Sequence, residues 1–285
     1  MEFRDKVVLV TGASSGIGYQ AARAFAERGA IVVPVARREA QLQDLVEDLR
    51  GHSPNSFYIT GDLADQSFAQ ELVRETVRRV GRIDVLINNA GISKHKQIYH
   101  LSAEEAEHVM RVNFLSAVST SLAAIPPMLI QGGGFIVNVS SFAAKVTPPR
   151  EAIYAASKAA MNSFTQGLWN DLAGSNIHAA IVNPGPIDTE IWGKLDEPPA
   201  YDGPKYPAQI VVDAIFEVIE KRRCEVTVPR WSPQLASARI LGLLAPAVLR
   251  AGMSRMEPVP SEVIERARAK AREQAADEPR STSRN

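Results

Sequence analysis

A tyrosine and a lysine four residues apart are the side chains in this sequence best suited to chemistry. Tyr154 and Lys158 lie in the run Tyr-Ala-Ala-Ser-Lys, and this spacing places both on one face of a helix. A nearby ammonium group favours the phenolate, so it lowers the pKa of a tyrosine from its free value of about 10. Such a phenol can exchange a proton with a substrate oxygen near neutral pH. The alternative is an ordinary Tyr/Lys pair on a helix surface.

A glycine-rich turn near the N-terminus predicts a dinucleotide site. The apolar residues 7–10 predict a buried strand and residues 19–28 a helix, and between them lies Thr11-Gly12-Ala13-Ser14-Ser15-Gly16-Ile17-Gly18. A helix N-terminus presents unpaired N–H groups to a pyrophosphate, and glycines let the backbone approach it because they lack a Cβ. The spacing differs from the usual Gly-x-Gly-x-x-Gly pattern, and an ordinary glycine-containing turn is the alternative.

Taken together, the motifs of the chain resemble the short-chain dehydrogenase/reductase family. Over about residues 5–230 they occur in the family's order: the glycine turn, Asn88-Asn89-Ala90-Gly91, Asn113, Ser141, the Tyr154/Lys158 pair and Pro184-Gly185. The resemblance implies a Rossmann-like α/β fold, a doubly wound parallel sheet of about seven strands with helices on both faces.

The resemblance also implies a role for each matching residue. Tyr154 matches the family's general acid/base, and Lys158 matches the lysine that lowers the tyrosine pKa and holds the nicotinamide ribose. Ser141 matches the serine that binds the substrate oxygen. Asn113 matches an asparagine that completes a proton relay, although an asparagine inside a helix can also be satisfied locally. The residues expected to contact the cofactor are Gly12, Ser14, Ser15, Gly16, Ile17, Gly18, Arg37, Arg38, Asp62, Leu63, Asn88, Ala90, Gly91, Tyr154, Lys158, Pro184, Gly185, Ile187 and Thr189.

Two arginines after the second predicted strand favour NADP(H) over NAD(H). An acidic residue at this place binds the ribose 2′-hydroxyl of NAD, whereas an arginine accommodates the 2′-phosphate of NADP. The chain has Ala36-Arg37-Arg38 and no acid there. The arginines are alternatively a basic start to the next helix, and Ser15 stands where some NADP-preferring relatives carry a basic residue.

The predicted function is therefore NADPH-dependent reduction of a ketone or aldehyde to an alcohol, or the reverse, by hydride transfer. A non-catalytic dinucleotide-binding protein and a membrane-associated partner protein are the alternatives. The set of Tyr154, Lys158, Ser141 and Asn113 argues against a protein without catalysis. The five histidines, His52, His95, His100, His108 and His178, lack metal-ligand spacing, so no metal is predicted. His95 and His100 follow the Asn-Asn-Ala-Gly turn and either border the substrate or are solvated loop residues, and the second interpretation is favoured.

Strands and helices alternate through residues 1–230, which we expect to form the catalytic domain. Predicted strands cover 7–10, 30–36, 57–60, 83–87, 135–139, 177–182 and 225–228, and the longest predicted helix covers 103–130. This alternation is typical of a parallel sheet covered on both faces. The turns after four of the strands would meet at one edge, where ligands bind in such sheets. Pro34 is unusual inside a strand, and Pro126-Pro127 is expected to disturb the long helix.

Two regions depart from this alternation. Residues 190–207 are rich in proline and lack periodicity, which is typical of a lid, and Trp192, Tyr201 and Tyr206 either form an apolar wall or pin the loop to the body. Residues 231–276 predict a helical extension, and residues 277–285 a disordered tail. The extension has an apolar stripe (Leu241, Leu244, Val248 and Leu249) opposite Arg239 and Arg250. Such a helix can lie on a membrane surface, but packing on protein, over the substrate pocket or against a partner subunit, is the favoured interpretation.

Composition bounds the class of protein. The chain has 285 residues, 45% hydrophobic and 22% charged, as in soluble globular proteins. The chain has 32 lysines and arginines together and 32 aspartates and glutamates together. With no net positive charge, it has no overall electrostatic attraction for nucleic acid. The single Cys224 excludes an internal disulfide framework and fits a reducing compartment. We see no leader and no apolar run of about 20 residues. A cytoplasmic homo-oligomer acting on a small carbonyl or alcohol is expected, with peripheral membrane association as an alternative.

Overall fold

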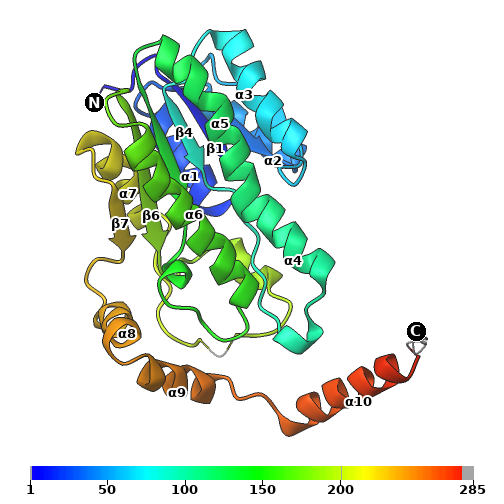
Figure 1. The fold of residues 1–285 in the computed structure, drawn as a ribbon. Coiled ribbons are helices and arrows are strands. Elements are labelled where there is room, and N and C mark those ends of the chain that lie inside the picture. Colours follow the sequence, from blue (N-terminus) through cyan, green and yellow to red (C-terminus); the bar gives the residue numbers. More distant parts are fainter. Residues whose placement is uncertain (1, 200, 278–285) are drawn as a thin grey trace, which may run out of the picture.

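The computed structural model describes residues 2–199 and 201–277 and is built on a seven-stranded parallel sheet (Figure 1). The strand order is β3-β2-β1-β4-β5-β6-β7, so the direction of winding reverses between β1 and β4. The strands are β1 (Val7–Thr11), β2 (Ile31–Ala36), β3 (Ile59–Thr60), β4 (Val85–Asn88), β5 (Gly134–Val139), β6 (Ile177–Pro184) and β7 (Glu225–Val228). Ligands bind at such a reversal, outside the carboxyl ends of the strands. The predicted fold class is confirmed.

Helices cover both faces of the sheet, and each face has its own core. On β1, Val8 and Val10 belong to one cluster of buried apolar side chains, while Val7 and Leu9 belong to the other. This alternation is the period of two of a strand, and burial of both sets explains the continuous apolar run in the sequence. The first cluster is covered by α1 (Gly16–Ala26), α2 (Glu39–Leu49) and α7 (Gln209–Glu220), and the second by α3 (Gln66–Val80) and α5 (Ser116–Ile130).

Pro34 lies inside β2 without costing a hydrogen bond. Two residues earlier, Val32 faces the β3 side of the strand, where its N–H donates to Ser56 Oγ and its carbonyl accepts from Phe57 N. Pro34 faces the same side because strand residues alternate, and β3 pairs with β2 only from Val35 onward. The missing N–H of the proline therefore falls where no partner strand needs it.

The long helix predicted over 103–130 is interrupted near its middle rather than at its prolines. It consists of α4 (Ala103–Met110), a π-helical turn (Arg111–Leu115) and α5, and Pro126 and Pro127 lie inside α5. By length and composition alone, this is the one stretch among the described residues that could cross a membrane. Ala124 and Met128 are nevertheless fully buried in the second core cluster. The stretch therefore acts as a core helix in this fold.

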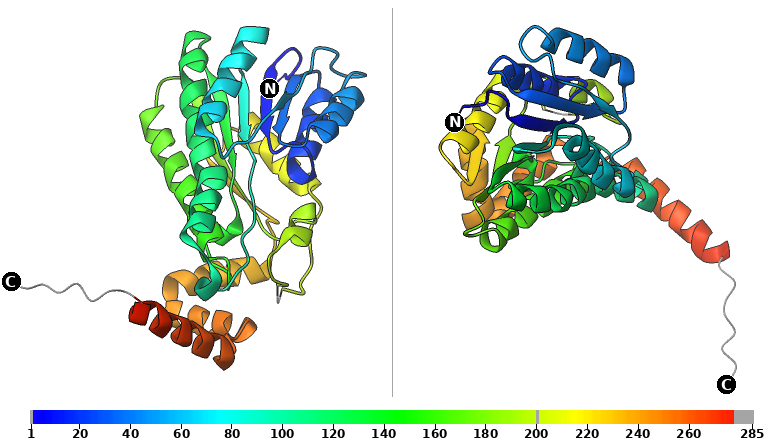
Figure 2. Two further views of the ribbon diagram at one scale, coloured as in Figure 1. Left: turned by 90° about the vertical axis from the view of Figure 1, so that its right-hand side faces the viewer. Right: turned by 90° about the horizontal axis from the view of Figure 1, so that it is seen from above.

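Beyond β7, three helices run across the end of the molecule toward which the strands point (Figures 1 and 2). They are α8 (Pro233–Leu244), α9 (Pro246–Met256) and α10 (Ser261–Asp277). Ser232 caps α8 through its hydroxyl, which accepts from Leu235 N, and Pro246 occupies the start of α9; proline suits this place because its missing N–H would be unpaired there. The expected tail, apart from Asp277 at the end of α10, lies outside the described residues.

Candidate active site

The turn between β1 and α1 leaves no room for a side chain at its glycine positions. Gly12 and Gly16 have φ angles of +67° and +58°, a region that glycine enters without strain. A Cβ on Gly18 would lie 2.5 Å from the Gly12 carbonyl oxygen. Ser15, the N-cap of α1, makes no side-chain capping bond, so the first N–H groups of α1 can receive a phosphate. The turn thus fits the pyrophosphate of a dinucleotide.

Thr11 and Asn89 fix this turn against the end of β4. Thr11 Oγ1 accepts from Asn89 N and Ala90 N, both at 3.0 Å, and Asn89 Nδ2 donates to Thr11 O at 3.0 Å and Gly12 O at 3.3 Å. Asn88, which the resemblance implies as a cofactor contact, has its Nδ2 donating to Asn138 Oδ1 at 2.8 Å inside the core. The Asn88 side chain is therefore committed to the core, and only its main chain remains for a cofactor.

Arg38 lies across the glycine turn. Its guanidinium donates to Ser14 Oγ at 3.0 Å and to Ser15 Oγ at 2.8 Å, and it pairs with Glu190 at 3.2 Å. Arg37 is mostly exposed, with Nη1 4.0 Å from Asp62 Oδ2. Leu63 is buried next to Asp62. The two arginines and the two serine hydroxyls form a polar, cationic edge at the place where the predicted cofactor would carry its adenine ribose.

Tyr154 and Ser141 form a hydrogen-bonded pair at the carboxyl end of the sheet. Tyr154 lies in the first turn of α6 (Ala152–Asp171), and Ser141 follows β5 and accepts from Ala143 N at 3.1 Å. Burial raises the pKa of Tyr154 to about 12, and the hydrogen bond with Ser141 only partly opposes this rise. The net shift is therefore upward, opposite to the direction predicted from the Tyr154/Lys158 spacing, because burial dominates.

Lys158 is buried one turn farther along α6. Burial lowers the pKa of its ammonium group to about 8, and Nζ donates to Val139 O at 3.0 Å. A Cβ on Gly91 would lie 3.4 Å from Lys158 Nζ and 3.5 Å from Asn113 Oδ1. The bare backbone at Gly91, the lysine and the asparagine therefore converge, as the resemblance implies.

Asn113 lies in the π-helical turn and is fully buried. Its Oδ1 accepts from Ile92 N at 2.8 Å, and its Nδ2 donates to Ile92 O at 3.0 Å and Ser157 Oγ at 3.1 Å. The side chain is thus satisfied by partners outside its own helix rather than locally. It ties the π-helical turn to the segment after β4 and to α6, next to Lys158.

Tyr154 and Ser141 open onto a pocket of about 560 Å³. The predicted segment Pro184, Gly185, Ile187 and Thr189 lines it, as do Trp192, Tyr201 and Tyr206. The three aromatic side chains thus form part of the pocket wall, and contacts of Trp192 also hold the loop to the body. Trp192 Nε1 donates to Ile187 O at 2.7 Å, and its ring stacks on Tyr201 with centroids 5.9 Å apart. Aromatic side chains of residues 190–207 therefore cover the pocket in this structure.

The C-terminal extension completes the same pocket. Its lining residues are Leu235 and Ala238 on α8, and Met253 and Met256 on α9, followed by Glu257. These side chains come from outside the strand–helix alternation, so the resemblance gave them no role. The favoured interpretation of the extension, packing on protein, holds for this side of the helices.

His95 is buried, contrary to the expectation of a solvated loop residue. Only 2% of it is exposed, its Nδ1 lies 3.6 Å from Glu151 Oε1 and its Nε2 lies 3.4 Å from Glu257 Oε2. Glu257 Oε2 also lies 2.8 Å from Arg150 Nε, and Arg150 pairs with Glu197 at 2.7 Å. Hydrogen bonding to Glu151 raises the pKa of His95 against the effect of burial. This His95 cluster joins four segments around the pocket, and its partners are too distant in sequence for spacing to reveal them.

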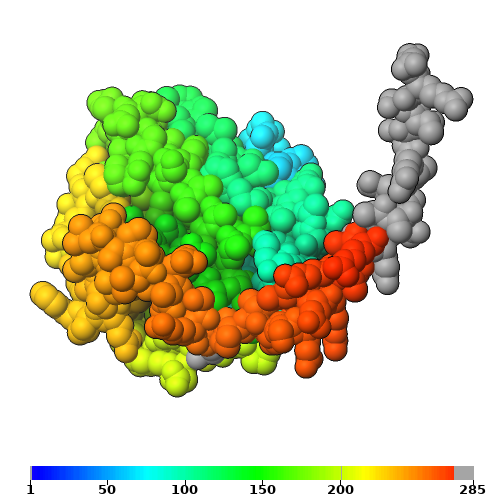
Figure 3. All heavy atoms as spheres, turned by 60° about the horizontal axis from the view of Figure 1, so that its bottom comes forward, coloured from blue at the N-terminus to red at the C-terminus, as the bar shows by residue number. Residues whose placement is uncertain are grey.

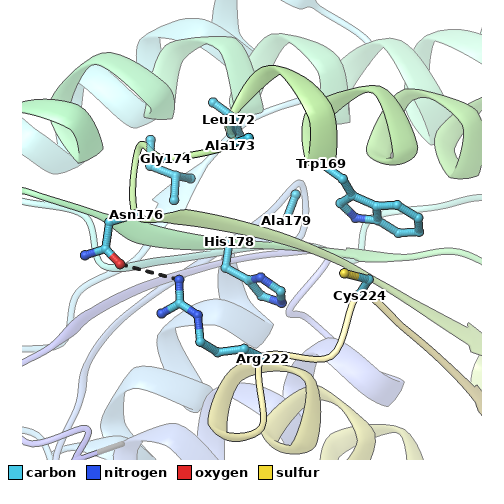
Figure 4. Close-up of a pocket in the computed structure, with 10 residues that line it drawn as sticks. Trp169, Leu172, Ala173, Gly174, Asn176, His178, Ala179, Arg222 and Cys224 are labelled. Carbon is cyan, nitrogen blue, oxygen red and sulfur yellow. Dashed lines mark hydrogen bonds between the residues drawn. The ribbon is translucent and has the colours of Figure 1, made fainter.

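A second hollow, of about 440 Å³, lies near the start of β6, at the end of the strand away from the Tyr154 pocket (Figure 4). Trp169, His178 and Cys224 line it, and Arg222 donates to Asn176 Oδ1 at 3.4 Å. None of the predicted site residues contributes to it. Within residues 2–199 and 201–277, no group of three or more histidine, cysteine, aspartate or glutamate side chains is arranged to hold a metal ion.

Comparison with known proteins agrees with this geometry. The family model for short chain dehydrogenases matches residues 6–200. The chain belongs to the short-chain dehydrogenase/reductase family. An uncharacterized oxidoreductase of Thermotoga maritima is 40% identical over 190 residues, which are 67% of this chain and 75% of that protein.

Solved structures of the family extend the likeness over most of the chain. A short-chain dehydrogenase from Sphingobium yanoikuyae in complex with NADPH has a TM-score of 0.73 at 30% identity, covering 90% of this chain and 96% of its own. A family member from Burkholderia phymatum in complex with NAD has a TM-score of 0.78 at 25% identity. The match covers 91% of this chain and 99% of the Burkholderia chain. This chain is accordingly an oxidoreductase that acts on CH–OH groups with a nicotinamide dinucleotide.

Proposed function

We propose that the protein catalyses the NADPH-dependent reduction of a ketone or aldehyde to an alcohol, or the reverse oxidation. The observation that carries the proposal is the hydrogen-bonded Tyr154/Ser141 pair, which opens onto an apolar pocket. The glycine turn and the convergence of Gly91, Asn113 and Lys158 support a cofactor beside that pair. A non-catalytic dinucleotide-binding protein would not need a proton donor in such a pocket.

When bound, the nicotinamide cofactor supplies or accepts the hydride. Tyr154 donates its proton to the carbonyl oxygen, and the Ser141 hydroxyl donates a hydrogen bond to the same oxygen. Lys158, with a pKa of about 8, stays mostly protonated near pH 7. Its charge then stabilises the phenolate left on Tyr154, and Asn113 holds the neighbouring backbone in place for the return of a proton. In oxidation the same residues act in the reverse order.

A preference for NADP(H) follows from Arg37 and Arg38. Both are available at the edge of the glycine turn, and Arg38 is aimed there by its hydrogen bonds to Ser14 and Ser15. A guanidinium recognises phosphate with charge-assisted hydrogen bonds. Glu190 pairs with Arg38, so a 2′-phosphate would compete with this carboxylate.

Turnover assays test the proposal. A panel of apolar ketones and aldehydes is offered with NADPH or NADH, and the matching alcohols with NADP or NAD, while absorbance of the reduced cofactor is followed. We expect turnover of at least one apolar carbonyl or alcohol, with the phosphorylated cofactor favoured. Efficient use of NADH over NADPH would refute the cofactor assignment, and absence of turnover despite cofactor binding would favour the non-catalytic alternative.

We also propose the finer organisation of the protein. Residues 1–230 form the catalytic domain and residues 231–276 an extension of it, in a cytoplasmic homo-oligomer. Leu122, Leu129 and Ile130 are exposed on α5, and an apolar helix face of this kind suits contact with a second copy. Sedimentation of the wild type and of a Leu122→Asp variant tests this assembly, which we expect the variant to weaken.

A further inference from the structure

The segment from Trp231 through α9 carries exposed apolar side chains. Trp231 is 94% exposed, Leu244 is 81% exposed and Leu243 is 75% exposed, and Ile240 and Val248 are exposed with them. We call these five residues the outer patch. None of the residues within α8 or α9 is buried. An exposed patch of this kind marks an interaction site.

On α8, two residues of the outer patch lie opposite the face that the helix uses within the molecule. Leu235 and Ala238, one turn apart on α8, line the pocket, and at 3.6 residues per turn Ile240 and Leu244 lie on the opposite side of that helix. The helix is thus apolar both toward the pocket and toward solvent. The apolar side chains on its solvent side therefore remain available for contact with protein or lipid.

The charges on these helices indicate what covers the outer patch. Between Trp231 and Met256 the chain carries Arg239, Arg250 and Arg255 and no acidic residue. All three arginines are exposed, and none pairs with a carboxylate in the part of the chain that the structure describes. Arg230, just before this segment, differs because it pairs with Glu217. The segment therefore combines exposed apolar side chains with uncompensated positive charge, and Arg239 and Arg250 lie on the side of the helices away from Leu244 and Val248.

We propose that α8 and α9 dock on the surface of a membrane that contains anionic lipids. The apolar side chains enter the boundary between headgroups and acyl chains, and the arginines remain at the level of the lipid phosphates. Trp231 suits the same depth, where tryptophans gather in membrane proteins. Viewed from this end of the molecule, α8 and α9 lie at the surface with no other described element over them (Figure 3).

A second copy of the chain is a poorer partner for this surface. A two-fold symmetric contact brings the same patch of both copies together. The arginines of one copy would then face a segment with arginines and no acidic residue. Anionic lipid complements this charge, whereas a symmetric dimer would concentrate it.

Binding of the full chain to phosphatidylcholine vesicles, with and without phosphatidylglycerol, tests the proposal. We expect binding to the mixed vesicles and little binding to phosphatidylcholine alone. One arginine near an anionic surface strengthens binding about fivefold, so the triple variant Arg239→Gln/Arg250→Gln/Arg255→Gln should bind roughly a hundredfold more weakly. Added salt should weaken wild-type binding in the same direction.

A second pair of variants separates insertion from charge alone. Leu243→Ser/Leu244→Ser should reduce binding by roughly tenfold or more, since each leucine loses the gain from leaving water. The control is Ile98→Ser, which removes an exposed apolar side chain outside α5, α8 and α9 and should leave binding unchanged. The emission of Trp231 should shift to shorter wavelength on binding, and Trp231→Phe should remove that shift.

Three outcomes would overturn the proposal. One is failure to bind the mixed vesicles at low salt, and another is equal binding to both kinds of vesicle. The third is self-association that depends on Leu243 and Leu244 in a protein that binds no vesicles, which would assign the patch to a second copy. None of these readouts requires turnover, so they do not depend on the proposed function.

Discussion

Replacing Lys158 with methionine should stabilise the protein while it abolishes activity. The lysine is buried, and burial lowers its pKa from 10.5 to about 8. At 1.36 kcal/mol for each pKa unit, holding the charged group in the fold costs about 3 kcal/mol near neutral pH. Methionine has a similar length without the charge, but it leaves the Val139 carbonyl, which accepts from Nζ, without that donor at a cost of about 1 kcal/mol. The variant should therefore gain about 2 kcal/mol.

The dependence on pH gives the prediction its sharpest form. The free-energy cost of burying the charged Lys158 is fully present below pH 8, because the lysine is then charged in both the folded and the unfolded chain. It declines between the folded pKa of about 8 and the unfolded value of 10.5, where the unfolded chain binds more protons. The difference between variant and wild type should therefore shrink over this range. Tyr154, with its pKa raised to about 12, titrates alike in both proteins and cancels from the difference.

Urea unfolding of the cofactor-free protein at several pH values measures this difference. Lys270→Met is the control, since Lys270 is exposed on α10 and its replacement should change the free energy of unfolding by less than about 0.5 kcal/mol. A Lys158→Met variant that is less stable than the wild type at pH 7, or whose difference does not change with pH, would refute the reasoning from burial.

Three further predictions concern the edges of the site. Glu190→Gln should tighten NADPH binding by at most about fivefold, because exposed ion pairs such as Glu190–Arg38 are worth up to about 1 kcal/mol; Glu47→Gln, at another exposed pair, is the control in the same titration. Replacing Arg37 and Arg38 with glutamine should weaken NADPH binding by about 1.5–3 kcal/mol for each charge-assisted bond lost and leave NADH nearly unchanged, and equal losses for both cofactors would contradict the assignment. Protonated His95 attracts Glu151 and Glu257, and its pKa is raised in the folded protein. The stabilisation that the charged histidine provides is therefore complete below about pH 6.5 and is lost as the pH rises through the pKa of the folded state. Glu257→Gln should therefore speed proteolysis within residues 231–260 and flatten its pH dependence, and unchanged cleavage would show that the His95 cluster does not hold the extension.

The fold and the inner part of the site were predictable because their signals are local. The Tyr154/Lys158 spacing and the glycine turn each specify geometry within one helix or one turn, and the structure places them as expected. The alternation of strands and helices likewise follows from patterns a few residues long. The second strand was predicted despite Pro34, and the position of that proline on the β3 side explains how it is tolerated.

What the sequence did not reveal depends on distant partners and on burial. Asn88 and Asn89 are adjacent, and only the pairing of β4 with β5, where Asn88 lies opposite Asn138, decides which one faces the turn. His95 is buried because Glu151 and Glu257 reach it from later in the chain. The pKa of Tyr154 was predicted in the wrong direction since spacing shows the neighbouring charge but not the loss of water.

Tyr154→Phe, assayed for turnover and for NADPH binding in the same preparation, tests the central claim most directly. The change removes only the phenol oxygen and its proton, and the ring that lines the pocket remains. The account predicts that turnover falls to a small fraction of the wild-type kcat while the Kd for NADPH stays nearly the same. Tyr58→Phe, which removes an exposed hydroxyl near Glu39, should leave both quantities unchanged. Substantial turnover by Tyr154→Phe would contradict the assignment of Tyr154 as the proton donor.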